Sequence, residues 1–202
     1  MVSSFLTLLE TKYADRLDEN GKMYIEYAVN GAKRMRQIIL DLLELSMVGR
    51  SNEAQKLIDV NKMVQEIILL YKKQVEEKNA VIEIGELPAI KGYTASVRQV
   101  FQNLIGNALK YSKKDTAVHV TVSATELKDY WQFAIADNGI GIAAEYFEKI
   151  FVIFQRLHKK EEFSGTGIGL AITKKVIESY GGKIWIASKE GEGTTFYFTF
   201  KK

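Results

Sequence analysis

The 202-residue sequence predicts an α+β protein, in which an antiparallel helical hairpin precedes an α/β sandwich with a mixed sheet and helices on one face. Three observations predict this. Apolar residues in the first quarter of the chain keep the three-to-four spacing of a helix seam. Beyond it, short β-branched and aromatic runs alternate with helical segments, and the strand candidates outnumber the helices and follow one another like hairpins.

The hairpin is expected in residues 1–52, as the first of two domains. Its seams run over Val2–Tyr13 and Ile25–Leu42, on either side of a turn-like polar stretch at residues 18–21. Further apolar residues widen the stripe beyond what one partner helix covers. This favours half of a four-helix bundle formed by two chains, and the alternative is a hairpin packed on its own second domain.

A second domain is expected over residues 53–202, after a polar linker at residues 49–53. Asn61 and Thr94 are expected to cap helices, since both can accept a hydrogen bond from a first-turn amide. Strands are predicted near residues 57–60, 80–84, 89–92, 118–122, 131–135, 183–188 and 195–200, and helices near residues 61–78, 94–111, 144–154 and 167–180.

Composition limits the chemistry. The chain has no cysteine, which excludes disulfides and thiolate metal sites, and it has only two histidines, His119 and His158. The net charge is +3, with no run of four basic residues, so nucleic-acid binding is not expected. No apolar run approaches the roughly 20 residues of a membrane span, so this segment is not expected to contact a membrane.

Three glycine-containing stretches are candidates for ligand binding. Residues 137–141 follow a strand, residues 165–170 open a helix, and residues 191–195 form a strand-to-strand turn. Glycine lets the backbone approach a ligand, and the amides of a helix start can bind an anion. A dinucleotide-binding fold is excluded because no strand precedes the second stretch, and no P-loop or protein-kinase motif set occurs. Alone, each stretch fits a tight turn or a helix start equally well.

The predicted helix over residues 94–111 carries a polar face. Asn103 and Asn107 are four residues apart, hence on one side, with Lys110 and Tyr111 one turn further on. An asparagine oxygen suits Mg²⁺ that already carries phosphate oxygens, and lysine supplies a point charge for phosphate. By themselves, two such asparagines are more often simply exposed polar residues.

Taken together, these stretches resemble the motifs of sensor histidine kinases, in the family's order. Residues 103–112, NLIGNALKYS, resemble the N box; residues 137–142, DNGIGI, the G1 box; and residues 150–156, IFVIFQR, the F box. Residues 165–170 and 191–196 match the two later glycine motifs. The sequence FQRLH at residues 154–158 is similar to that of the phytochrome-like and PAS-linked branch of the family. The hairpin resembles the family's dimerisation and phosphotransfer domain.

The resemblance implies a Bergerat-type (GHKL) pocket for ATP and Mg²⁺. Asp137 would accept a hydrogen bond from the adenine amino group, supported by Thr194 directly or through water. Asn107 would bind Mg²⁺, with Asn103 alongside. The other nucleotide-binding residues that it implies are Lys110, Tyr111, Gly139, Gly141, Ile142, Gly165, Thr166, Gly167, Gly169 and Leu170.

The family's reaction is phosphoryl transfer, and the resemblance implies an ATP lid over residues 155–166. It also implies catalytic roles for Asn107, Lys110 and Arg156, which would be the cation of that lid. In the family, the acceptor histidine lies on the first hairpin helix and is followed by an acid, but residues 1–17 contain no histidine. His119 and His158 lack that context. We therefore expect a fragment that begins after the acceptor and does not phosphorylate itself; a degenerate kinase is the alternative.

Two other functions remain open from the sequence. Gyrase- and MutL-like ATPases place a water-activating glutamate four residues before the Mg²⁺-binding asparagine, where this chain has Asn103, which cannot act as a base. A nucleotide-binding regulatory or scaffold module would bind ATP without transferring it. The kinase interpretation implies a cytoplasmic homodimer joined through the hairpin, an upstream sensor domain in the full-length protein, and a response-regulator receiver domain as partner.

Overall fold

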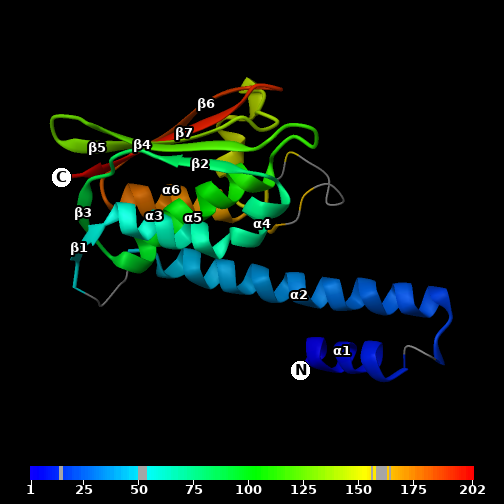
Figure 1. Ribbon diagram of the computed structural model, residues 1–202. Helices are drawn as coiled ribbons and strands as arrows, with labels where there is room; N and C mark the ends of the chain where they lie inside the picture. The colour runs from blue at the N-terminus through cyan, green and yellow to red at the C-terminus, as the bar shows by residue number, and fades with distance from the viewer. Residues whose placement is uncertain (14–15, 50–53, 156, 158–162, 164) are drawn as a thin grey trace. The chain divides into compact units, whose positions relative to one another are not determined.

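The computed structural model describes residues 1–13, 16–49, 54–155, 157, 163 and 165–202. The chain divides into two compact units, Met1–Glu44 and Leu45–Lys202 (Figure 1). Among the described residues, no helix combines the length and the apolar character that crossing a membrane would take.

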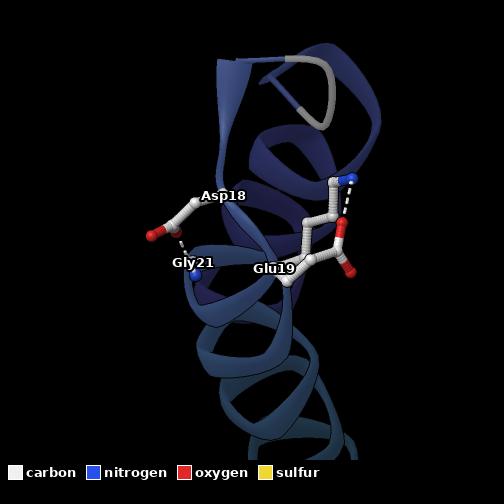
Figure 2. Close-up of polar contacts among 4 residues, drawn as sticks. Asp18, Glu19 and Gly21 are labelled. Carbon is white, nitrogen blue, oxygen red and sulfur yellow. Dashed lines mark hydrogen bonds and ion pairs between the residues drawn. The ribbon is translucent and has the colours of Figure 1, made fainter.

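The first unit contains the predicted helical hairpin, formed by α1 (Val2–Tyr13) and most of α2 (Glu19–Met47). The polar residues 18–21 were expected to form a turn, but they contain the start of α2. The Asp18 carboxylate accepts the Gly21 amide at 2.7 Å, and Glu19 pairs with Lys22 at 2.9 Å (Figure 2). Asp18 thereby satisfies one of the amides that every helix start leaves free, and the helix begins there.

The second unit contains a five-stranded mixed sheet, which confirms the predicted fold class. Its strand order is β2-β4-β5-β7-β6; β2 is parallel to β4, and the other neighbours are antiparallel. The strands are β2 (Val81–Ile84), β4 (His119–Glu126), β5 (Tyr130–Asp137), β6 (Ile184–Lys189) and β7 (Gly193–Lys201). A separate two-stranded sheet pairs β1 (Lys56–Asp59) with β3 (Ala89–Gly92).

Helices cover one face of the five-stranded sheet, as the sequence predicts. Figure 1 shows α3 (Val60–Leu70), α5 (Thr94–Lys110) and α6 (Gly169–Ser179) on the same side of it. The core lies between, where Phe133 and Phe198 stack at 5.4 Å and Phe101 of α5 meets both rings edge-on. Each such buried aromatic contributes roughly 2–3 kcal/mol of burial free energy, which fixes α5 against the sheet.

Two predicted helix caps are wrong. Asp59, not Asn61, caps α3 by accepting the Lys62 amide, whereas the Asn61 side chain donates to the Leu87 carbonyl. Thr94 is already the first residue of α5, which has no side-chain cap. The predicted helix over residues 61–78 is also interrupted at Tyr71, after which a short α4 (Lys72–Glu77) follows.

The helix expected near residues 144–154 is likewise wrong. Two short 3₁₀ turns occur instead, η2 (Ala144–Tyr146) and η3 (Lys149–Phe151). Aromatic and β-branched side chains dominate this segment, and they lose rotamer freedom in an α-helix. The chain therefore makes single turns that bury Ile150, which lines the pocket described below.

Candidate functional site

A pocket opens beside α5, where β5 ends and β7 begins. It brings together seven of the residues that the resemblance assigned to nucleotide binding. These are Asn107, Tyr111, Asp137, Gly141, Ile142, Leu170 and Thr194. The lining also includes Gln155 and Leu157 of the expected ATP lid, and three residues to which the sequence gave no nucleotide role: Ile140, Ile150 and Phe196.

Asp137 is the half-buried acid of this pocket, and it is the last residue of β5, directly paired with Thr194 of β7. Its Oδ1 accepts the backbone amides of Gly139 at 2.8 Å and Thr194 at 3.3 Å. Its other oxygen has no hydrogen-bond partner among the described residues. Burial raises the pKa of Asp137 to about 6, although both amides and the charge of Lys113 act in the opposite direction.

Thr194 is buried beside the acid, and a second hydroxyl holds it. The Ser188 Oγ of β6 lies 2.9 Å from the Thr194 Oγ1, accepts the Ile142 amide at 2.8 Å and donates to the Gly193 carbonyl at 2.7 Å. Sequence reasoning missed Ser188. The available signal was the predicted turn at residues 190–193. The two strands that it joins pair so that Ser188 lies opposite Thr194.

Two glycines of the pocket are required by backbone packing. Gly141 has φ of +70°, and a Cβ there would overlap the Lys189 carbonyl. Gly193 has φ of +124°, and a Cβ would overlap the Asp137 carbonyl. These approaches lock the loop after β5 against the β6–β7 turn, so the glycines shape the pocket from within the protein.

The walls of the pocket are mostly apolar. Ile140, Ile142, Ile150, Leu170 and Phe196 line it, so that a flat ring between them would lose water on both faces. The Ile140 backbone is held on both sides, donating to the Tyr111 carbonyl and accepting from the Gly191 amide. The pocket therefore combines apolar walls with one polar end at Asp137 and Thr194.

A larger cleft adjoins the pocket and is cationic. Lys78, Lys110, Lys113 and Lys114 line it, against the carboxylates of Glu77 and Asp115. Asn103 and Gly165 line it too, and Asn107 lines both cavities. A ligand with an aromatic ring in the pocket would therefore extend its charged end past Asn107 toward the lysines.

The two asparagines on α5 have different surroundings, although the sequence placed them on one face. The Asn103 Nδ2 donates to the Gly169 carbonyl at 3.1 Å and to the Thr173 hydroxyl at 3.3 Å, tying α5 to the first turns of α6. Asn107 has no side-chain hydrogen bond among the described residues. Asn107 is thus available to a ligand, and Asn103 is engaged in joining two helices.

Lys110 and Tyr111 interact at the boundary between the cavities. The Lys110 Nζ donates to the Tyr111 hydroxyl at 2.9 Å and lies 4.4 Å from the ring centroid. The Phe163 ring packs against the Tyr111 ring, with centroids 4.8 Å apart. A Cβ at Gly165, which has φ of +135°, would lie 2.9 Å from the Lys110 Nζ. The absence of a side chain at Gly165 therefore leaves room for the lysine head group.

Lys78 is a further residue that the sequence did not single out. Its Nζ donates to the Leu109 carbonyl at 2.7 Å and to the Ser112 hydroxyl at 2.8 Å, at the end of the helix that carries Asn107 and Lys110. Burial lowers the pKa of Lys78. A lysine at a helix C-terminus satisfies a free carbonyl and complements the helix dipole, so Lys78 fixes the end of α5.

Some predicted site residues lie outside both cavities or cannot be placed. Four of them line neither cavity: Gly139, Thr166, Gly167 and Gly169. The Gly169 carbonyl accepts a hydrogen bond from the Asn103 side chain. Arg156, the expected lid cation, lies outside the described residues. The nucleotide roles of these residues stay predictions.

The family described as "Histidine kinase-, DNA gyrase B-, and HSP90-like ATPase" matches residues 92–202. The chain therefore belongs to that family, and its second unit is a catalytic domain of the sensor histidine kinase type.

Comparisons with individual proteins agree with this assignment. The chain is 43% identical over 198 residues to the phytochrome-like protein Cph1 of Synechocystis sp., a match that covers 98% of this chain and 26% of Cph1. It thus spans about a quarter of that relative, and the similarity agrees with the phytochrome-like wording of residues 154–158.

Two solved structures share the fold. Full-length ShkA in complex with AMPPNP superposes with a TM-score of 0.74 at 23% identity, covering 98% of this chain and 42% of ShkA. The histidine kinase ThkA in complex with the response regulator protein TrrA gives a TM-score of 0.68 at 22% identity, covering 98% of this chain and 57% of ThkA.

Proposed function

We propose that the second unit binds Mg-ATP and transfers the γ-phosphoryl group to a histidine that this sequence does not contain. The phosphoryl group then passes to an aspartate of a response-regulator receiver domain. The observation that carries the proposal is the acid at the end of β5. One Asp137 oxygen is bonded by two backbone amides, and the other is left to a pocket with apolar walls. Such an acceptor suits the amino group of adenine.

The cationic cleft supports the orientation of the nucleotide. With adenine at Asp137, the phosphates would pass Asn107 and meet the lysines of the adjoining cleft. ShkA, which shares the fold, was solved with AMPPNP, a close analogue of ATP. Lys110 supplies the positive charge nearest to Asn107 in the sequence, and charge neutralisation is the main work of a phosphoryl-transfer site.

The residues also fit Mg²⁺. Among the described residues, no group of three or more histidine, cysteine, aspartate or glutamate side chains is placed to hold a metal ion. Mg²⁺ that enters with ATP keeps phosphate and water oxygens and needs few protein ligands. The amide oxygen of Asn107 would be one of them, and the bound ion would neutralise phosphate charge.

The site favours transfer over hydrolysis. A hydrolase of the gyrase type needs a base one helical turn before the metal ligand, and Asn103 occupies that position here. Its amide donates to α6 and has no acid–base capacity. Transfer to a histidine supplied from outside therefore accounts for the site better than attack by water.

The chain is not expected to phosphorylate itself. His119 is the first residue of β4, an exposed strand residue whose amide donates to the Asn138 side chain. It lies on no helix and has no acid directly after it, unlike the acceptor of the family. His158 lies outside the described residues.

The hairpin supplies the proposed dimer contact. Exposed apolar side chains follow α2, among them Met35, Ile39 and Leu43, each more than half exposed in the single chain. An apolar stripe of this length is typical of a bundle seam. A homodimer would bury it, and sedimentation equilibrium measures the mass directly.

An upstream sensor domain and a cytoplasmic location, where ATP is supplied, belong to the same proposal. ThkA, solved with the response regulator TrrA, supports a receiver domain as partner.

The test is a transfer assay with γ-labelled Mg-ATP. The chain is incubated alone, and then with an isolated dimerisation hairpin of a sensor histidine kinase that carries the acceptor histidine. We expect acid-labile label on the added hairpin and none on the chain, and no transfer by Asn107→Ala. ATP binding without transfer to any supplied hairpin would favour a regulatory or scaffold module, and label on the chain itself would contradict the assignment of the histidines.

A further inference from the structure

The Ser188 hydroxyl has three hydrogen-bond partners but only one proton, so it can donate to only one of them. The Gly193 carbonyl, 2.7 Å from the Ser188 Oγ, can only accept, so it takes the serine proton. The Ile142 amide, at 2.8 Å, can only donate, so it uses one serine lone pair. The Ser188 hydroxyl therefore has one lone pair left and no proton to give.

The third partner of Ser188 must then be a donor. The Thr194 Oγ1 lies 2.9 Å away, and with the serine proton already committed, the threonine proton points at Ser188. Thr194 lines the pocket and is buried. A ligand that reaches the Thr194 hydroxyl from the pocket would therefore meet lone pairs only, so the hydroxyl is a fixed acceptor.

The acid next to Thr194 presents the same polarity. The Asp137 Oδ1 is occupied by the amides of Gly139 and Thr194, which leaves the second carboxylate oxygen for a ligand. The polar end of the pocket thus offers two neighbouring acceptors, one charged and one neutral. A ring substituent there must donate, which suits a 6-amino purine, whereas the oxygen of a 6-oxo purine would meet lone pairs.

We propose that Ser188 is a specificity-determining positioning residue, which makes Thr194 an obligate acceptor and so selects 6-amino over 6-oxo purine nucleotides. Ser188 acts through Thr194 and has no contact with the base of its own. The inference rests on the proposed nucleotide function, because it assigns the purine to this pocket.

The test compares the affinities of ADP and inosine 5′-diphosphate (IDP), which differ at the 6-position of the base and in the proton that IDP carries on the adjoining N1. Wild type is expected to prefer ADP. Ser188→Ala frees the Thr194 proton to turn toward a 6-oxo group, so the ratio of IDP to ADP dissociation constants should fall about fivefold, the size of one neutral hydrogen bond. Ser188→Thr keeps the hydroxyl and should keep the ratio.

Two further variants separate positioning from structure. In a Thr194→Val background the ratio should not change when Ser188→Ala is added, because the hydroxyl through which Ser188 acts is gone. Ser188→Cys keeps the side-chain shape but is a poor acceptor, so it should lower the ratio even where Ser188→Ala does not fold.

The outcomes distinguish this inference from the proposed function. If Ser188→Ala and Ser188→Cys weaken ADP and IDP by the same factor, Ser188 only supports the loop and the inference is overturned. A further fall of the ratio in the Thr194→Val background would overturn it too. If wild type binds neither nucleotide, the proposed function itself fails.

Discussion

The pocket and the adjoining cationic cleft are built differently; we call them the adenine end and the phosphate end, after the parts of ATP that they are proposed to bind. At the adenine end, Asp137, Thr194 and Ser188 come from three neighbouring strands and are held by one another and by backbone amides. At the phosphate end, Asn107 and Lys110 lie on a single helix, and Asn107 has no hydrogen-bond partner among the described residues. In the proposed complex, base recognition would be set before the ligand arrives, whereas phosphate recognition would depend on charge and on side chains that can still adjust.

The largest expected effect is at the adenine end. Asp137→Asn keeps an oxygen to accept the amides of Gly139 and Thr194, but it places an amino group where the free carboxylate oxygen faces the pocket. The new side-chain amino group and the adenine amino group are both hydrogen-bond donors, so they could not bond to each other. ADP affinity should fall about a hundredfold, the equivalent of ~3 kcal/mol.

Calorimetric titration measures this change, and the thermal midpoint of the free protein is its control. The midpoint should not fall, because the internal hydrogen bonds of Asp137 are kept. An affinity within about threefold of wild type would place adenine elsewhere and remove the distinction between the two ends.

Sequence reasoning found only part of each end. Asp137, Thr194 and Asn107 belong to contiguous motifs, so their chemistry was readable from residue types and order. Ser188 and Lys78 act through hydrogen bonds to residues that are neighbours only after the strands pair or the helices pack. No local pattern marks such a contact.

The fold was predictable for a related reason. Periodicity located the strands and the longer helices, because burial on one face repeats along each element. It failed at residues 144–154, where the chain makes isolated 3₁₀ turns, and it could not show what the Asn103 side chain contacts. Helical spacing placed Asn103 beside Asn107, but only the packing of α6 engages its amide.

An intermediate effect is expected from aspartate substitutions at the two asparagines. Asn103→Asp removes both donors and sets a carboxylate against the Gly169 carbonyl, which should cost about 2 kcal/mol and lower the thermal midpoint by ~5 °C. Asn107→Asp breaks no hydrogen bond among the described residues, so the midpoint should be unchanged.

The same pair gives opposite results in nucleotide binding. Asn107→Asp adds a negative charge beside the phosphates, so ADP binding without Mg²⁺ should weaken, and Mg²⁺ should recover more of the affinity than in wild type. Asn103→Asp should leave the gain from Mg²⁺ as it is. Equal loss of thermal stability in both variants would show that Asn107 is also structural, and the contrast between the asparagines would disappear.

The smallest expected effect is a pH dependence confined to the adenine end. Burial raises the pKa of Asp137 from 3.8 to about 6, so the carboxyl binds a proton at a higher pH in the folded protein than in the unfolded chain. Its contribution to folding stability is therefore present below pH ~4 and is lost as the pH rises through about 6.

Nucleotide binding depends on pH in the opposite sense, because the adenine amino group needs the ionised carboxylate. At pH 5.5 about a quarter of a group with a pKa near 6 is ionised, so ADP affinity should fall roughly fourfold between pH 7.5 and 5.5. The phosphates of ADP titrate in the same range, and Asp137→Asn cancels their effect when the two pH profiles are divided. If the divided profile is flat, the carboxyl is ionised throughout, and the adenine end is no more sensitive to protons than the phosphate end.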